Sequence, residues 1–496
     1  MKHTIKIFSL LLATALLSSC LDFEELRENP NEPNSVAPGL LFTALIPGTY
    51  ASFDNTYMHS QYHLRADTDY GDFSYRYGSS SFSYNDIKDI GKMEEEAITA
   101  NAPAYLIMAK FLRSIYYIQM TRDMGDIPLS EAARAEEGII RPKYDTQKEV
   151  YIQCLEWLDE ASNELADYIN ENPSVTLTGD FYFDGDLRAW QKVINTFTLR
   201  TLISLSIKAD DADLNVKGRF ANIINNPADY PLMEGLEDNM QIEHWDEDDF
   251  RGIYNPNNTQ YINIIVYLDT YIDMLKDYHD PRLFSVADPT LVALEANPDD
   301  PEGVRMDFDS YEGCDISDDA NTNAVKRANG EVSKPNADRF NNFAGQPSIY
   351  IGYVEQELII AEAAHRGWIS ADAATHYNNG VRASMEYYNV SSTDTDDYLS
   401  GSGAYETGDA GLTKILEQQY IALAENSGWE SFFMTRRTGV PTYKFSEVNL
   451  VEQIPVRWMY PASEITDNAD NYRAALSAQF GSETDSRDGV MWILQD

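Results

Sequence analysis

The sequence has no long hydrophobic run. Its most apolar stretch, residues 7–17, is shorter than the roughly 20 residues that a transmembrane helix needs, and no later run approaches that length. The rest of the chain is therefore expected to form a body outside the bilayer. At 496 residues the chain also exceeds the ~250–300 residues at which a single core stops growing, so we expect several lobes or a repeat architecture.

Cysteine is scarce as well. The three cysteines, Cys20, Cys154 and Cys314, are too few for a scaffold held together by disulfides. Cys154 falls in a segment with an amphipathic helical pattern and Cys314 in an acidic loop, and their positions in the sequence do not bring them together. We interpret both as free thiols.

Basic residues are the third deficit. The chain has 37 Lys and Arg against 81 Asp and Glu, a formal net charge of −44. Nucleic-acid binding is excluded by this balance, because phosphate contacts need clustered basic side chains. Surface binding to anionic lipid is excluded for the same reason. The charge favours neutral or basic ligands over polyanionic ones.

The N-terminus has the layout of a secretory signal. Lys2 and Lys6 precede the apolar stretch, and small residues then lead to Cys20. Leu17-Ser18-Ser19-Cys20 resembles the lipobox of bacterial lipoproteins, in which the peptide is cut before the cysteine and the cysteine carries acyl chains such as palmitate. Two or three such chains hold a protein firmly in a membrane. The alternative is an ordinary secreted protein in which Cys20 is incidental.

The residues after Cys20 indicate where a lipoprotein would be sorted. Leu21 follows directly, so the aspartate that retains some lipoproteins in the inner membrane is absent from that position. Asp22, Glu24 and Glu25 resemble the acidic export tag of surface lipoproteins in the Bacteroidota. The expected location is the outer membrane, with the body exposed at the cell surface.

Helical periodicity dominates most of the body. The pattern predicts helices at 38–53, 84–98, 103–124, 146–165, 187–207, 261–278, 350–366, 371–388 and 412–427. The pair 350–366 and 371–388 resembles a tetratricopeptide repeat, because Ala373, Tyr377 and Gly380 follow its small–aromatic–small spacing.

Two stretches rich in aromatic and polar residues interrupt the helical pattern. Residues 59–84 and 225–347 read as long loops, and long loops in compact proteins are often functional. A tyrosine or tryptophan can stack on the apolar face of a sugar while polar neighbours bond its hydroxyls. We therefore select Tyr75, Tyr77, Trp245 and Tyr254 as ligand-binding candidates. The alternative for each ring is that it fills the core of its own lobe, which is how Trp157, Trp190, Trp429 and Trp458 are interpreted.

Several sequence blocks, in this order, resemble the SusD/RagB family of outer-membrane lipoproteins, specifically the SusD-like lineage with a Gly-Asp-x-x-x-Trp block. The blocks are 29–31, 111–113 continuing to 125–129, 185–190, 280–283, 361–367, 436–441 and 454–461. The resemblance covers the whole length of the chain.

The resemblance implies a mainly α fold, with a scaffold of tetratricopeptide-like helical pairs and a loop-rich ligand-binding lobe. It implies a non-catalytic protein that captures glycan at the cell surface and delivers it to a SusC-like TonB-dependent transporter. A peptide-binding RagB-like protein would share the same blocks. The chain then divides into a signal peptide (1–19), a lipidated N-terminus and tether (20–35) and a SusD-like body (36–496), whose loop-rich lobe is mainly 59–84 and 225–347.

No catalytic motif stands out. The seven histidines lack zinc-protease spacing, and the sequence has neither a Gly-x-Ser-x-Gly elbow nor a phosphate-binding loop. A glycosidase needs only two suitably spaced carboxylates, and with 81 acids the sequence does not exclude such a pair. A lipid-anchored glycoside hydrolase is therefore kept as the alternative of another class.

Metal binding is weighed in the same way. Asp67, Asp69 and Asp72, and separately Asp307 and Asp309, offer oxygen ligands for calcium but do not follow the twelve-residue EF-hand pattern. His59 and His63 would share one face only if the segment were helical. We expect no cofactor, with a structural calcium ion as the alternative.

Overall fold

Most of the chain is helical in the computed structural model, which describes residues 35–49, 53–248, 250–252, 255–257, 259, 262–426 and 428–496. The signal peptide, Cys20 and the tether up to residue 34 lie outside the described residues, as does Tyr254. Among the described helices, none is long and apolar enough to cross a membrane.

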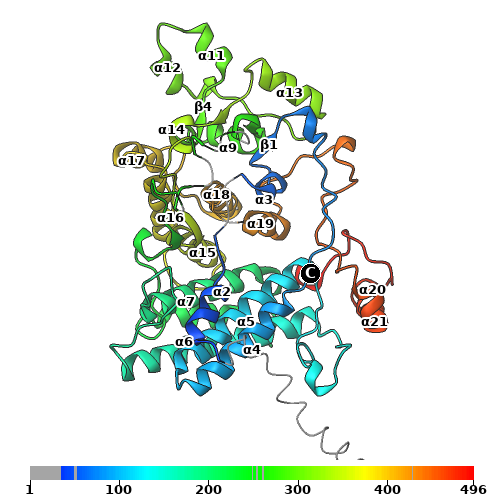
Figure 1. The fold of residues 1–496 in the computed structure, drawn as a ribbon. Coiled ribbons are helices and arrows are strands. Elements are labelled where there is room, and N and C mark those ends of the chain that lie inside the picture. The colour runs from blue at the N-terminus through cyan, green and yellow to red at the C-terminus, as the bar shows by residue number, and fades with distance from the viewer. Residues whose placement is uncertain are drawn as a thin grey trace, which may run out of the picture.

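Long helices pack together at one end of the molecule (Figure 1). They are α4 (Tyr84–Thr99), α5 (Pro103–Met124), α6 (Gln147–Glu171) and α7 (Leu187–Ser204), together with the shorter α2 (Pro38–Leu45) and α8 (Val216–Asn225). The four helices expected between residues 84 and 207 are confirmed. The helix expected at 38–53 instead stops at Leu45, because Ile46 precedes Pro47 and takes the extended conformation that a proline favours in the residue before it.

Local sequence signals set the ends of these helices. Pro103 occupies the first turn of α5, and Gly125 follows its last residue with φ of +99°, a conformation that glycine adopts without strain. Thr146 and Glu149 form the capping box expected at the start of α6, each side chain bonding the other residue's backbone N–H.

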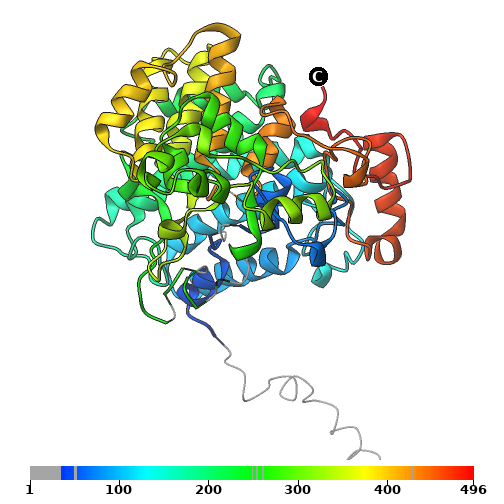
Figure 2. The same cartoon turned by 90° about the horizontal axis from the view of Figure 1, so that it is seen from above.

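Further helices lie between this layer and the opposite end of the molecule. They are α15 (Tyr353–His365), α16 (Ala373–Tyr387), α17 (Ser392–Ser400), α18 (Gly408–Ala422) and α19 (Glu430–Thr438), followed by the peripheral α20 (Glu464–Asp467) and α21 (Ala469–Phe480). Figures 1 and 2 both place α16 and α17 on the side opposite α20 and α21. The helices expected at 350–366, 371–388 and 412–427 correspond to α15, α16 and α18.

The tetratricopeptide-like pair α15–α16 depends on one glycine. A Cβ atom on Gly380 of α16 would lie 2.7 Å from Cγ of Leu358 on α15, closer than real Cβ atoms approach other atoms. Leu358 is itself buried between α15, α16 and α18, so it has little room to move. The small residue expected from the repeat spacing is therefore required for the two helices to approach.

Gly380→Ala should destabilise the protein by about 1–3 kcal/mol, because overpacking outweighs the gain in helix propensity. Gly91, in the middle of α4, is the matched control, since a Cβ there meets nothing within 4 Å. Gly91→Ala should stabilise by about 0.5–1 kcal/mol. Urea unfolding of both variants measures the difference, and two shifts of the same sign would contradict this account.

The opposite end is built from short elements. The helices are α3 (Asn55–His59), α9 (Asp269–Asp277), α10 (Arg282–Val286), α11 (Leu291–Ala296), α12 (Pro301–Arg305), α13 (Ala320–Ala328) and α14 (Ala337–Phe340). Among the described residues, two antiparallel strand pairs accompany them: β1 (His63–Arg65) with β3 (Ile265–Tyr267), and β4 (Ala287–Asp288) with β5 (Lys334–Pro335). The antiparallel pair of β2 (Met240–Ile242) with β6 (Ser348–Ile351) instead packs on the core of the long helices.

This lobe is more regular than the sequence predicted. The segment 225–347 was expected to be largely loop, but Thr290, Asp300, Asp319 and Asn336 each cap a short helix with a side-chain oxygen. The helix expected at 261–278 begins only at Asp269, since β3 precedes it and pairs with β1.

The largest hydrophobic core lies among α4, α5, α6 and α7 and reaches the C-terminal segment. Trp190 is fully buried in it, and its indole N–H donates to Asp180 Oδ2 at 2.9 Å. Trp458 is also buried, whereas Trp157 and Trp429 are half-buried against core clusters. Cys154 and Cys314 are buried free thiols, which confirms the interpretation from sequence.

Buried ion pairs occur both within one segment and between segments that are far apart in the sequence. Glu362 of α15 accepts from Arg437 of α19, with N–O distances of 2.5 and 2.9 Å, and no part of the Glu362 side chain is exposed. Asp280 and Arg282 form a second pair that is almost completely buried. Both pairs belong to the blocks 280–283, 361–367 and 436–441, so these blocks serve the architecture.

Candidate functional site

Tyr75 lies in the core, contrary to its selection as a ligand-binding residue. Its ring is fully buried against Leu64 and Val266, and its hydroxyl is bonded to the side chain of Gln61. Burial raises the pKa of the Tyr75 hydroxyl well above its usual value. A ring with no exposed face offers nothing for a ligand to stack on, so the core alternative describes Tyr75.

Tyr77 is half-buried in an aromatic cluster. Its ring stacks on Trp458 with centroids 4.6 Å apart, and its hydroxyl donates to the Pro455 carbonyl at 2.8 Å. His59 contacts the edge of the same ring, and burial lowers the pKa of His59 to about 4. Tyr77 and His59 therefore fill the interior here. His59 ends α3 whereas His63 begins β1, so the two histidines are not on one helical face.

Trp245 differs from these residues because it is exposed. Its ring stacks on that of Phe250, with centroids 4.4 Å apart and planes 15° from parallel, yet 43% of Trp245 and 46% of Phe250 remain accessible. A tight turn produces this arrangement: the Trp245 N–H donates to the Phe250 carbonyl at 3.1 Å, and the Phe250 N–H donates to the Glu247 carbonyl at 2.8 Å. We call Trp245 and Phe250 the ring pair.

The residues around the ring pair hold the turn against the body. Arg251 donates from Nε to Asp246 at 2.8 Å, and its guanidinium carbon lies 4.5 Å from the ring centre of Phe343. On the other side, His244 Nε2 lies 3.0 Å from Ser348 Oγ, at the start of β6. The turn is therefore held at both ends, through His244 by β6 and through Arg251 by the irregular segment that contains Phe343, with acidic side chains at the rim.

The sequence named only part of this site. Phe250, Arg251 and Phe343 were not selected. The signal that could have found Phe250 is the second aromatic ring five residues after Trp245, across an acidic turn. Arg251 and Phe343 come together only through the fold. Tyr254 lies outside the described residues, so its selection stays a prediction.

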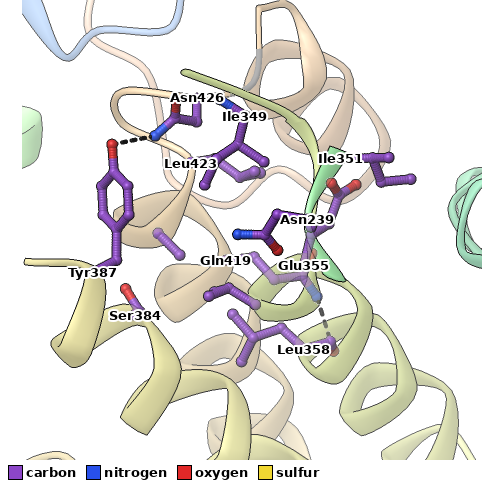
Figure 3. A pocket seen from close by; sticks show the side chains of 13 residues that line it. Asn239, Ile349, Ile351, Glu355, Leu358, Ser384, Tyr387, Gln419, Leu423 and Asn426 are labelled. Atoms are coloured by element: carbon purple, nitrogen blue, oxygen red, sulfur yellow. Dashed lines mark hydrogen bonds between the residues drawn. The ribbon is translucent and has the colours of Figure 1, made fainter. Parts of the chain in front are cut away.

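Apart from the ring pair, a small hollow lies between β6, α15, α16 and α18 (Figure 3). Apolar side chains such as Ile349 and Leu358 line it together with a few polar groups, and Asn426 donates to the Tyr387 hydroxyl at 2.7 Å. Its volume of about 40 Å³ holds a few water molecules but no sugar ring.

Another hollow, between α9, α18 and residues 441–444, is acidic. It encloses about 410 Å³ and is lined by Asp269, Asp273, Asp277 and Glu417. Burial raises the pKa of Asp269, although Lys444 lies 2.7 Å away and opposes that shift.

The acidic stretches considered for calcium form turns. Asp67 and Asp307 each accept from the backbone N–H two residues ahead, of Asp69 and Asp309, at 3.0 Å. Asp72 accepts instead from the Ala320 N–H at 2.6 Å. Among the described residues, no three His, Cys, Asp or Glu side chains are grouped to hold a metal ion.

Comparison with known proteins identifies a family and solved structures that share this architecture. Residues 30–461 match the SusD-like family described as "starch-binding associating with outer membrane". A Bacteroides vulgatus outer-membrane protein, described as involved in nutrient binding, is 32% identical with a TM-score of 0.80; the match covers 93% of this chain and all of that one. A SusD homologue from Bacteroides fragilis is 31% identical, with a TM-score of 0.81 and the same coverage.

A more distant structure, that of a chitin-binding protein, shares the fold with a TM-score of 0.67 and 23% identity. The match covers 93% of this chain and all of the chitin-binding protein. The search of curated proteins gave no match. The family match over most of the chain and the two relatives above 30% identity agree with the mainly helical fold. The chain belongs to the SusD-like family of nutrient-binding proteins associated with the outer membrane.

Proposed function

We propose that this protein is a cell-surface lipoprotein that binds a glycan and delivers it, without chemical change, to a SusC-like TonB-dependent transporter. The exposed ring pair, held on a turn rimmed by acids, is the observation that carries this proposal. The family's description as starch-binding and the chitin-binding relative support a glycan as the ligand. The lipid on Cys20 and the transporter partner rest on the resemblance of the sequence to this family.

The chemistry of the ring pair suits a sugar. The apolar C–H face of a pyranose can lie on an indole ring, and carboxylates such as Asp246 and Asp248 can accept from its hydroxyls. One small stacking surface gives weak binding, and a millimolar dissociation constant corresponds to about −4 kcal/mol. Weak binding is enough beside a transporter, because tethering raises the effective ligand concentration to the millimolar range.

The direct test is native gel retardation of the mature chain in a panel of neutral and acidic polysaccharides, with reducing-sugar release assayed on the same mixtures. Retardation without new reducing ends is the expected result. New reducing ends would overturn the proposal in favour of a lipid-anchored glycoside hydrolase. If no polysaccharide retards the protein, no reducing ends appear and the protein binds peptides, the RagB-like alternative would be favoured.

Trp245→Ala should lower glycan affinity at least tenfold, because truncation removes the larger ring of the ring pair. Phe181 provides the matched control: it is a similarly exposed aromatic residue, 47% accessible, far from Trp245 in the sequence. Phe181→Ala should leave retardation unchanged. Equal retardation of the Trp245→Ala variant and the unmodified protein would exclude the ring pair as the binding surface.

A further inference from the structure

A large polar cavity lies away from the ring pair, where three distant segments meet. It encloses about 670 Å³, within the ~300–1,000 Å³ typical of small-molecule sites. Its walls come from Arg76, the loop 450–459 and residues 485–488. We call it the arginine cavity. In Figure 1 the blue segment after β1 descends beside the orange and red segments that form its other walls.

Two arginines in this cavity are anchored but not paired. Arg76 donates from Nε to the Leu450 carbonyl at 2.7 Å, and Arg487 donates from Nε to the Tyr77 carbonyl at 2.5 Å. Among the described residues, no ion pair or hydrogen bond involves the terminal amino groups of either side chain. Each guanidinium is thus held through one nitrogen while its two-pronged end remains available, the geometry that binds carboxylate and sulfate oxygens in pairs.

Many arginines of this chain pair with a carboxylate, but others do not: Arg188 donates to Gln191, and Arg436 donates to backbone carbonyls. Acidic residues outnumber basic ones 81 to 37, so carboxylate partners are abundant. Arg122, for example, forms an ion pair with Glu430 at 2.6 Å, and Arg200 forms one with Glu355 at 2.5 Å. Arg76 and Arg487 differ from the other arginines without a carboxylate partner because both line the same large cavity.

The cavity wall is firmly built. The Arg487 carbonyl accepts from the backbone N–H groups of Val456 and Arg457, at 3.1 and 3.2 Å. Asp485 on the same wall is bonded to Arg457 and to the Tyr460 N–H, so its charge is already balanced within the protein. A preorganised wall of this kind lowers the entropic cost of fixing a ligand.

Acceptors stand beside the two donors. Glu452 and Asp488 also line the cavity, and among the described residues neither has a basic partner within ion-pair distance. A neutral sugar would leave both arginines without an anion, and a bare inorganic anion would leave both carboxylates without a donor. An acidic sugar has both an oxyanion for the arginines and hydroxyls for the carboxylates.

We infer that the arginine cavity is a second glycan subsite that binds an acidic sugar unit through its oxyanion, either a uronate carboxylate or a sulfate ester. That the oxyanion is carried by a glycan rests on the proposed function; the site itself rests on the two arginines. Arg76 and Arg487 should favour an anionic ligand in this cavity, whereas the net charge of the whole chain favours neutral or basic ligands. The acidic surface still repels a polyanion at long range, so moderate salt should accelerate its association.

The test is calorimetric titration of the mature chain with an oligogalacturonate, a sulfated galactan oligosaccharide and a neutral xylo-oligosaccharide. Arg76→Gln and Arg487→Gln should each weaken binding of the acidic oligosaccharide at least tenfold and leave the neutral one unchanged. Whichever acidic probe binds identifies the oxyanion as carboxylate or sulfate. Arg76 is exposed and tests the site even if Arg487→Gln perturbs folding. Arg141→Gln, at an exposed residue outside the cavity, is the control and should change nothing.

The inference and the proposed function can fail separately. Acidic oligosaccharides that bind no tighter than neutral ones, with no effect of either arginine variant, would overturn the second subsite and leave glycan binding at the ring pair intact. Loss of neutral binding in Trp245→Ala with retained acidic binding would support two independent sites. Binding of a peptide C-terminus that is abolished by amidation would overturn the assignment to a glycan.

Discussion

Glu362→Ala should destabilise the protein by about 3–5 kcal/mol, the cost of leaving a buried charge without its partner. Glu362 is completely buried and accepts from Arg437, from Arg366 Nε at 2.9 Å and from Gln419 at 3.2 Å. Its removal leaves the Arg437 guanidinium, only 6% exposed, without a carboxylate at the contact between α15 and α19. The free energy of unfolding in urea measures the loss.

An exposed pair on the same molecule provides the control. Arg382 and Asp396 are 2.6 Å apart but 48% and 64% exposed, and such pairs contribute about 0–1 kcal/mol. Asp396→Ala should therefore change stability little. If Glu362→Ala cost no more than Asp396→Ala, the buried pair would not be a structural connection between α15 and α19.

The pH dependence of stability provides a second test of the contribution that Glu362 makes to stability. Burial alone would raise the pKa of Glu362, but Arg437 and Arg366 outweigh it and hold that pKa below the usual 4.5. A lowered carboxyl pKa contributes stability that is complete above about pH 4.5 and is lost as the pH falls through the native pKa. The unmodified protein should lose this contribution on acidification, and Glu362→Ala should lack that part of the pH profile.

Local signals made the long helices predictable. The ends of α5 follow from Pro103 and Gly125, and the start of α6 follows from its capping box, because these residues act within one turn of the helix. The helices α11 and α12 were missed because each spans only five or six residues and buries little apolar surface. Such segments give no periodic pattern to read.

The candidate site shows where sequence reasoning reaches its limit. Tyr75 and Trp245 are both aromatic residues in polar surroundings, yet one is buried and the other exposed. Long-range contacts make the difference: the Tyr75 N–H donates to the Asn449 carbonyl, more than 370 positions away, and Tyr77 stacks on Trp458. No local pattern around residue 75 contains that information. The turn that exposes Trp245 is local, which is why that selection found an accessible ring.

Cys20→Ala should move the protein out of the outer-membrane fraction almost completely. The proposed anchor is a set of acyl chains on Cys20, and each buried CH₂ contributes about 0.8 kcal/mol, so two or three chains give effectively permanent attachment where one gives marginal binding. None of the described helices is long and apolar enough to cross a membrane. Without the cysteine, both the acylation and the cleavage that depends on it should be lost.

Fractionation and palmitate labelling together test this anchor, and Cys154→Ala is the matched control. Cys154 is buried in the main helical core and lies far from the signal peptide, so its variant should remain labelled and membrane-bound. The intact mass of the Cys20→Ala protein shows whether the first 19 residues are still attached, which separates release from retention by an uncleaved signal. Sedimentation of a cleaved, unlabelled Cys20→Ala protein with the outer membrane would count against lipidation. It would mean that the protein is held there by a partner, because a surface this acidic is repelled by anionic lipid.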